Sequence, residues 1–227
     1  MLERYRDRQH AGEVLGRELA ERGYGGRDDL LVLGLPRGGV PVARQVARLI
    51  GGRLDVMLVR KLGVPGQEEL AMGAIASGGA RVLNRTVVQQ LGIDDETIAL
   101  AAAREGRELA RREHAYRHAR PEPVVTDRCA ILVDDGLATG SSMEVAIAAL
   151  KLRGPREVIV AVPVAPRETC ERLAGLVDAV VCPLTPRGFA GVGQFYDNFE
   201  QVTDEQVRET LAEVWREQAD EQHRRRA

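Results

Sequence analysis

Short runs of consecutive apolar residues alternate along the chain with stretches in which apolar residues recur every three or four positions. The first pattern predicts buried strands, and the second predicts amphipathic helices. The strands are expected at 30–35, 54–62, 129–135, 156–165 and 177–184. The helices are expected at 7–22, 40–50, 94–117, 141–154, 166–175 and from about 203 past Trp215. Continuous apolar strands that alternate with helices are typical of covered parallel sheets, so the pattern predicts an α/β fold with a mostly parallel sheet flanked by helices.

Two stretches interrupt this alternation. Residues 61–85 contain the expected loop GVPGQEE (63–69), followed by the short strand pair LAMGAIA and ARVLN. Residues 184–200 hold all three phenylalanines of the chain among glycines. The chain has 227 residues, which is enough for one sizeable core, and it shows no internal repeat or linker. We therefore expect a single domain over residues 1–227, with its core at about 28–183.

Composition and charge narrow the classes of partner. The chain has 32 Lys and Arg residues against 34 Asp and Glu residues, and its net charge of -2 gives no reason to expect nucleic acid as a partner. The opening MLERYRDRQH is charged, unlike a secretory signal, and no apolar run is long enough for a membrane span. Cys129, Cys170 and Cys182 form no CxxC pair, which is typical of reduced thiols. These features predict a cytoplasmic protein without a membrane partner.

The sequence ILVDDGLATGSS (131–142) combines two features that favour different ligands. Asp134 and Asp135 follow a buried strand, and carboxylates there favour hydrogen-bond donors or a metal ion. The small residues after them open a helix, where free backbone amides and the helix dipole favour a phosphate. A ribose 5-phosphate carries both a diol and a phosphate, so it fits both features. The alternative is an acidic turn and a serine-rich helix cap without a ligand.

This segment closely resembles the signature of type I phosphoribosyltransferases for phosphoribosyl pyrophosphate (PRPP). The segments PRGG, RKLGVPG and GQFY also resemble those of a bacterial phosphoribosyltransferase-like group. The resemblance implies the type I fold, with a mobile loop and with a small C-terminal hood at about 184–200, to which the N- and C-terminal helices add. It implies that Asp134 and Asp135 hold the ribose hydroxyls. The residues that it assigns to the 5-phosphate are Ala138, Thr139, Gly140, Ser141 and Ser142.

The same resemblance assigns two segments to the pyrophosphate of PRPP. In GLPRGGVPVA (34–43), Arg37 and the amides of Gly38 and Gly39 would hold it, and a strained or cis non-proline peptide would fit the family. In VRKLGVPGQEELAMGAI (59–75), the mobile loop, Arg60 and Lys61 would clamp the pyrophosphate oxygens. The alternatives are a simple glycine-rich turn and ordinary solvated cations at a strand end.

The implied reaction is transfer of the 5-phosphoribosyl group from PRPP to a nitrogenous base, a purine or a pyrimidine, with release of pyrophosphate and with Mg²⁺ as the cofactor. Its catalytic residues would be Arg37, Lys61, Asp134 and Asp135. Enzymes of the family that act on 6-oxopurines commonly carry an Asp where this chain has Ala138, and the ATG form resembles adenine phosphoribosyltransferases instead.

In the hood, Phe195 or Tyr196 would stack on the base. Asp197 would lie near the metal ion, so Mg²⁺ would be held through PRPP with Asp134, Asp135 and Asp197 as candidate ligands. Relatives often form dimers, which makes a homodimer an expectation. A non-catalytic protein of the same fold that binds PRPP or a nucleotide remains the alternative function.

Overall fold

The structure is a computed structural model, and it describes residues 3–117 and 120–226. Five parallel strands form the central sheet in the order β2-β1-β6-β7-β8. Their bounds are Leu30–Gly34 for β1, Arg53–Val56 for β2, Cys129–Val133 for β6, Glu157–Ala161 for β7 and Ala179–Val181 for β8. The register aligns Gly34 with Val133 and Val133 with Ala161. The carboxyl ends of β1, β6 and β7 therefore meet at one edge of the sheet, as the predicted parallel sheet requires.

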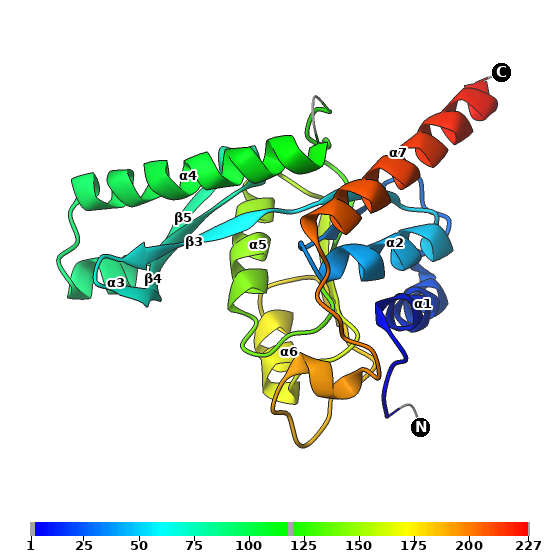
Figure 1. The fold of residues 1–227 in the computed structure, drawn as a ribbon, viewed down its shortest axis with the longest axis horizontal. Helices are drawn as coiled ribbons and strands as arrows, with labels where there is room; N and C mark the ends of the chain where they lie inside the picture. The colour runs from blue at the N-terminus through cyan, green and yellow to red at the C-terminus, as the bar shows by residue number, and fades with distance from the viewer. Residues whose placement is uncertain (1–2, 118–119, 227) are drawn as a thin grey trace.

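Helices cover both faces of this sheet (Figure 1). The helices that help to cover these faces are α1 (Arg8–Leu19), α2 (Gly39–Ile50), α5 (Ser141–Lys151), α6 (Arg167–Ala174) and α7 (Asp204–Arg226). Alternate strand residues point to opposite faces, so Val32 and Ile131 pack towards α1, α2 and α7. Leu33 and Leu132 pack towards α5 and α6. Both faces of the central strands are thus buried, which explains their uninterrupted apolar sequences.

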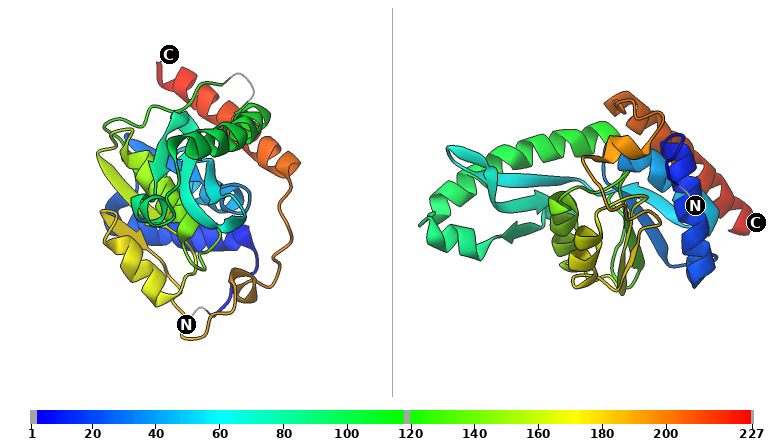
Figure 2. Two further views of the ribbon diagram at one scale, coloured as in Figure 1. Left: turned by 90° about the vertical axis from the view of Figure 1, so that its left-hand side faces the viewer. Right: turned by 90° about the horizontal axis from the view of Figure 1, so that it is seen from below.

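A second sheet projects from this body as an arm, residues 59–117 (Figures 1 and 2). Its antiparallel strands are β3 (Val59–Val64), β4 (Gln67–Ala76) and β5 (Arg81–Leu83). The short helix α3 (Arg85–Gln90) lies at its outer end, and α4 (Asp95–Arg117) runs back along the strands to the body. Single short helical turns at Ala20–Tyr24, Ser77–Gly79 and Val192–Phe195 complete the elements.

The strand expected at 54–62 is wrong in one respect, because the structure divides it into β2 and β3, which belong to different sheets. Met57 and Leu58 lie between them, and their amides donate to Gly34 O at 3.0 Å and to Ser77 Oγ at 3.1 Å. Both residues are buried, so the apolar pattern continues through the break and gives no sign of it.

The expected loop at 63–69 is instead a tight turn between two strands, β3 and β4, with Gly66 at a φ of +78°. The helix α3 was not predicted, although Asn84 gives a capping signal and accepts a hydrogen bond from the Val87 amide at 3.2 Å. Within the described residues, no helix combines the length and the apolar character that a membrane crossing requires.

Candidate active site

The two acidic residues of the signature lie at the carboxyl end of β6, in the middle of the sheet. The Asp135 amide donates to Asp134 Oδ1 at 2.9 Å. Burial, and then the charge of Asp135, raise the pKa of Asp134 well above its usual value. Burial also raises the pKa of Asp135, although a nearby arginine, Arg8, opposes that shift. The pair is therefore a buried acceptor that loses free energy when it is charged and unpartnered, which suits a ligand rich in hydroxyl donors.

The turn after β1 packs directly against this pair. A Cβ atom added to Gly38 would lie 1.9 Å from Asp135 Oδ2, and one added to Gly39 would lie 2.6 Å from Val133 O. The Leu35 amide donates to Val133 O at 2.8 Å, which fixes the start of the turn on β6. The peptide between Pro36 and Arg37 is cis, as the family resemblance led us to expect. The structure therefore brings the two predicted glycine-containing segments into contact, and only glycine fits this approach.

The predicted phosphate loop, residues 138–142, runs into the first turn of α5. Gly140 has a φ of +73°, and Thr139 Oγ1 lies 3.0 Å from Ser141 Oγ. Helix α6 holds the outer side of the loop: Thr169 Oγ1 donates to Ala138 O at 2.8 Å, and Arg172 donates to Thr139 O. The carbonyls of Ala138 and Thr139 are thus engaged by α6, while the first amides of α5 have no partner within that helix. This arrangement leaves amide and hydroxyl donors for an anion.

The three cations predicted to bind pyrophosphate differ in their surroundings: two lie near acidic side chains, and one is exposed. Arg37 lies with a guanidinium nitrogen 3.8 Å from Asp204 Oδ1, at the start of α7. Arg60 donates from Nε to Glu105 Oε2 at 2.8 Å, and this carboxylate belongs to α4. Lys61 is exposed on β3. Arg60 is thus engaged by an acidic partner that sequence reasoning missed, because Glu105 lies 45 positions further along the chain.

A small hollow joins these parts. It has a volume of about 150 Å³, and its polar lining comes from Arg60, Arg112, Asp134 and Ser142. The apolar lining comes from the turn after β1, from residues 57–59 and from Leu109 of α4. A neighbouring hollow of about 330 Å³ shares Arg60 and Ser142 and adds Lys61. The structure therefore brings together residues from the acid pair, the phosphate loop and the arm. Arg112, which sequence reasoning missed, joins them from α4.

The hood does not present its aromatic residues as we expected. Phe195 and Tyr196 are only 8% and 2% exposed, and they pack with Tyr5 of the N-terminal segment in one cluster. The Tyr196 hydroxyl donates to the backbone oxygen of Asp135 at 2.5 Å. Phe189 stacks on Phe195 with ring centroids 5.4 Å apart. The predicted stacking residues thus fill the interior of the hood, and Tyr196 supports the acid pair from behind.

The set of three acids proposed for the metal ion is wrong as a cluster. The Asp197 carboxylate is largely exposed and pairs with Arg4 at 3.3 Å. Nowhere in residues 3–117 and 120–226 do three His, Cys, Asp or Glu side chains gather closely enough to hold a metal ion. A metal ion at this site would need oxygens of the ligand beside the carboxylates of Asp134 and Asp135, and such oxygen donors are those that Mg²⁺ prefers.

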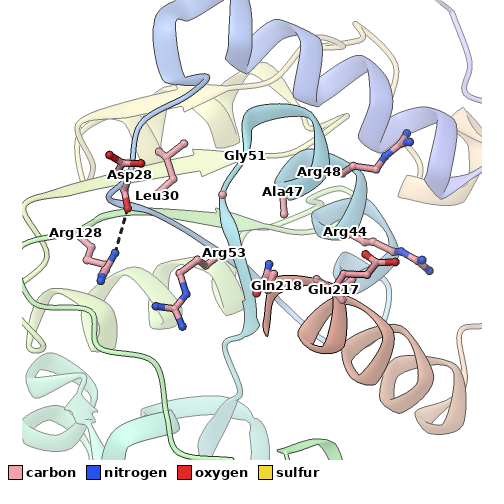
Figure 3. Close-up of a pocket in the computed structure, with 12 residues that line it drawn as sticks. Asp28, Leu30, Arg44, Ala47, Arg48, Gly51, Arg53, Arg128, Glu217 and Gln218 are labelled. Carbon is pink, nitrogen blue, oxygen red and sulfur yellow. Dashed lines mark hydrogen bonds between the residues drawn. The ribbon is translucent and has the colours of Figure 1, made fainter. Parts of the chain in front are cut away.

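A larger cavity of about 660 Å³ lies away from these residues (Figure 3). Its lining includes the first residues of β1 and β2, the end of α2 and one side of α7. Arg53 and Arg128 contribute charged side chains there, and Arg128 donates to the backbone oxygen of Asp28 at 3.4 Å. The strands begin at this cavity and end at the acid pair, so the cavity is at the opposite edge of the sheet and separate from the candidate active site.

Comparison with known proteins agrees with the fold. The model of the phosphoribosyl transferase domain matches residues 7–193. The crystal structure of TT1426 from Thermus thermophilus is 46% identical, covers 93% of this chain and 99% of its own, and superposes with a TM-score of 0.83. Two Mycobacterium tuberculosis proteins, from strains H37Rv and CDC 1551, are both named "Putative phosphoribosyl transferase" and are 44% identical over 201 residues. That match covers 88% of this chain but 45% of each relative, so the chain spans about half their length. The chain belongs to the phosphoribosyl transferase domain family.

Proposed function

We propose that the protein transfers the 5-phosphoribosyl group of PRPP to a nitrogen atom of a purine or pyrimidine base and releases pyrophosphate. The observation that carries this proposal is the meeting of three segments: the Gly38–Gly39 turn contacts the acid pair, and the phosphate loop follows that pair and shares a hollow with it. Each segment suits one part of PRPP, and the contact gives the three parts the short spacing that they have in one molecule.

The 5-phosphate and the ribose of PRPP fit the residues between the end of β6 and the start of α5. The loop 138–142 offers amides at the start of α5 together with the hydroxyls of Thr139 and Ser141, which suit the 5-phosphate. The carboxylates of Asp134 and Asp135 accept hydrogen bonds from the ribose hydroxyls. The ligand therefore supplies the donors that this buried acceptor pair needs.

The leaving group, pyrophosphate, carries negative charge that nearby cationic side chains can stabilise. When the nitrogen–C1 bond forms and the C1–O bond breaks, the bonding electron pair leaves with pyrophosphate, and positive charge develops on the ribose ring. Arg37, Lys61 and the amide of Gly38 stabilise the negative charge on pyrophosphate. The Gly39 amide, which the sequence also assigned to pyrophosphate, already donates to Leu35 O at 3.0 Å. Arg60 joins them when it exchanges Glu105 for a pyrophosphate oxygen. Catalysis then rests on positioning and on electrostatic stabilisation.

Mg²⁺ is the cofactor that the family resemblance implies, and the oxygen donors of Asp134 and Asp135 fit it. When bound, it would neutralise charge on the pyrophosphate oxygens. The residues of the chain would hold it together with PRPP, since the described carboxylates do not form a complete site. The three cysteines are free thiols, which fits the reducing cytoplasm in which we place the protein.

The class of acceptor base is inferred from the lining of the small hollow beside the acid pair. Ala138 supplies no side-chain acid, and its carbonyl is already engaged by Thr169. The hollow beside Pro36 and Asp134 is lined mainly by apolar side chains, such as Leu35, Met57 and Leu109. This lining favours a flat, uncharged ring over a charged acceptor.

A regulatory protein that binds PRPP or a nucleotide without turnover is the second candidate. One observation favours it: Arg60 and Asp135, two predicted ligand contacts, are engaged by Glu105 and Arg8. A sensor can exchange such contacts on binding without a chemical step.

One experiment separates the two candidates. The protein is mixed with PRPP, Mg²⁺ and each of a panel of purine and pyrimidine bases, and pyrophosphate release is measured beside PRPP binding by calorimetry. A transferase releases pyrophosphate with at least one base. Tight binding of PRPP with no release for any base would contradict the transferase and support the sensor. No binding at all would contradict both.

A further inference from the structure

The cavity of about 660 Å³ lies where β1 and β2 begin, between the end of α2 and one side of α7 (Figure 3). Its volume falls within the range of pockets that hold small molecules, about 300–1,000 Å³. Among the described residues, it shares none of its lining with the two hollows of the candidate active site. A ligand in this cavity would therefore occupy a second, separate site.

Arginine residues dominate the charged part of the lining. Four arginines face two acidic residues there: Arg44, Arg48, Arg53 and Arg128, with Asp28 and Glu217. Arg44 pairs with Glu213 at 2.9 Å, and Arg48 lies 3.9 Å from Glu13. Arg53 and Arg128 form no ion pair with any side chain in the part of the chain that the structure describes. These two guanidinium groups are therefore free to pair with an anionic ligand.

The backbone brings Arg53 and Arg128 to one side of the cavity. Arg53 is the first residue of β2, Arg128 immediately precedes β6, and both strands are neighbours of β1. Figure 3 shows the two guanidinium groups pointing in the same direction, while the Asp28 carboxylate points away from them. Arg128 uses one N–H to donate to the backbone oxygen of Asp28 at 3.4 Å. The remaining donors of this pair suit a phosphate group, whose oxygens accept paired hydrogen bonds from arginine.

Positive charge is also crowded around the start of β2. Burial lowers the pKa of Arg120, and the charge of Asp55 opposes that shift. The charges of Arg53 and Arg117 lower the pKa of Arg120 further. Asp55 is already paired with Arg117 at 3.1 Å. An anion bound at Arg53 would therefore reduce the repulsion between these cations.

The rest of the lining suits an organic ligand better than a bare inorganic ion. Leu30, Ala47 and Val214 contribute apolar surface to it. Gln218 adds a polar group, and its Oε1 atom is buried with no hydrogen-bond partner among the described residues. A buried acceptor without a partner costs free energy, which a ligand N–H group would recover. The cavity thus offers donors for a phosphate, apolar surface for a ring and an acceptor for a ring substituent.

We propose that this cavity binds a nucleoside phosphate. The phosphate is held by Arg53 and Arg128, the base packs on the apolar lining, and Gln218 accepts a hydrogen bond from an N–H group of the base. The site uses none of the residues assigned to PRPP. The proposal therefore does not depend on the proposed function.

The test measures binding of AMP, GMP, CMP and UMP by calorimetry, with inorganic phosphate as the comparison ligand. The site variant is Arg53→Gln with Arg128→Gln. The matched control is Arg81→Gln with Arg85→Gln, which removes two exposed cations from the arm. The melting temperature of each variant confirms that it folds.

At least one nucleotide should bind to wild-type protein and bind at least about tenfold more weakly to the site variant, because each charged hydrogen bond contributes about 1.5–3 kcal/mol. The control should bind like wild-type protein. Gln218→Met should weaken nucleotide binding about fivefold and leave phosphate binding unchanged. Inorganic phosphate that binds as tightly as every nucleotide would overturn the nucleoside part of the proposal.

Nucleotides can also bind to the candidate active site, so the double variant Asp134→Asn with Asp135→Asn is measured in the same way. A binding event that persists in this variant and weakens in the Arg53 and Arg128 variant belongs to the cavity. An event that behaves in the opposite way belongs to the candidate active site. If that is the only event, or if wild-type protein binds none of the four nucleotides, the proposal is overturned.

Discussion

The two sides of the candidate site are built in different ways. The ribose and phosphate side lies at the ends of β1 and β6, whose residues are all buried and whose neighbours on both sides are parallel strands. The arm side places Arg60 and Lys61 on β3, in a separate antiparallel sheet outside the body. There, an ion pair with Glu105 of α4 sets the orientation of Arg60.

The two sides therefore differ in what PRPP binding would require. The residues on the sheet side are already in place, whereas Arg60 on the arm would have to exchange its partner Glu105. On the sheet side, the glycine turn contacts the acid pair, and the phosphate loop shares a hollow with that pair, so PRPP would gain contacts without rearranging the backbone. On the arm side, Arg60 would reach the pyrophosphate of the proposed reaction only after Glu105 releases it. We therefore expect substitutions on the sheet side to have larger effects on PRPP binding than substitutions on the arm.

The largest effect is expected from the double variant Asp134→Asn with Asp135→Asn. It removes the charged acceptors for the ribose hydroxyls, and each hydrogen bond to a charged group contributes about 1.5–3 kcal/mol. PRPP affinity should fall at least about 100-fold, measured by calorimetry, while circular dichroism shows the fold retained. Asp197→Asn is the comparison, because Asp197 pairs with Arg4 on the surface. An equal loss of PRPP affinity in Asp197→Asn would instead support Asp197 as a third ligand of the metal ion.

Gly38→Ala should have the next largest effect. Its methyl group would lie 1.9 Å from Asp135 Oδ2, so either the turn or the carboxylate must move. Crowding of this kind costs about 1–3 kcal/mol of the free energy of unfolding, measured by urea titration. PRPP affinity should fall about tenfold. Gly188→Ala is the control, because a Cβ atom there meets nothing within 4 Å. If Gly38→Ala had the stability and PRPP affinity of wild-type protein, the close contact between this turn and the acid pair would be contradicted.

On the arm, Lys61→Ala should weaken PRPP binding by about fivefold, since an exposed ion pair contributes up to about 1 kcal/mol. The only other lysine, Lys151, lies on α5 and provides the matched control as Lys151→Ala. Glu105→Gln should act in the opposite direction and strengthen binding, because it frees Arg60. A loss in Lys61→Ala as large as that of the acid pair would remove the difference between the two sides.

The smallest effect concerns stability. The pKa of Asp134 is raised in the folded chain, so at a pH between its ordinary value and the raised one the folded state binds more protons than the unfolded state. The free energy of unfolding should therefore decrease as pH rises through that window. Asp134→Asn should flatten this dependence and be more stable at neutral pH than wild-type protein. Urea titrations from pH 5 to pH 8 measure it, and a less stable variant at neutral pH would contradict the raised pKa.

Sequence reasoning succeeded where local pattern decides the structure. The apolar run before Asp134 and the small residues after Asp135 place the acid pair at a strand end and the loop at a helix start, and both positions follow from neighbouring residues. It failed where distant residues decide. The break at Met57–Leu58 is set by which sheet each half joins, and the hood aromatics are buried by Tyr5, which comes from the other end of the chain.

Arg8 is the clearest example of that limit. It stands among charged residues at the start of the chain, and nothing in the sequence around it distinguishes it from Arg4 or Arg6. Its position beside Asp135 depends on Asp7, which caps α1, on backbone hydrogen bonds between residues 5–6 and the hood, and on the ring of Phe199. Only the tertiary structure brings these together.

The bond between Arg8 and the Glu200 carbonyl joins residues 192 positions apart, which has a consequence for the order of events during synthesis. On the ribosome, Arg8 is made before β1 and β6, and Phe199 and Glu200 are made after both strands. A nascent chain can pair β1 with β6 before the Arg8 guanidinium has its contacts with Phe199 and Glu200, because contacts between distant residues form late. The Asp135 carboxylate of such a chain would lack its fixed partner Arg8 until residues 199 and 200 have been made.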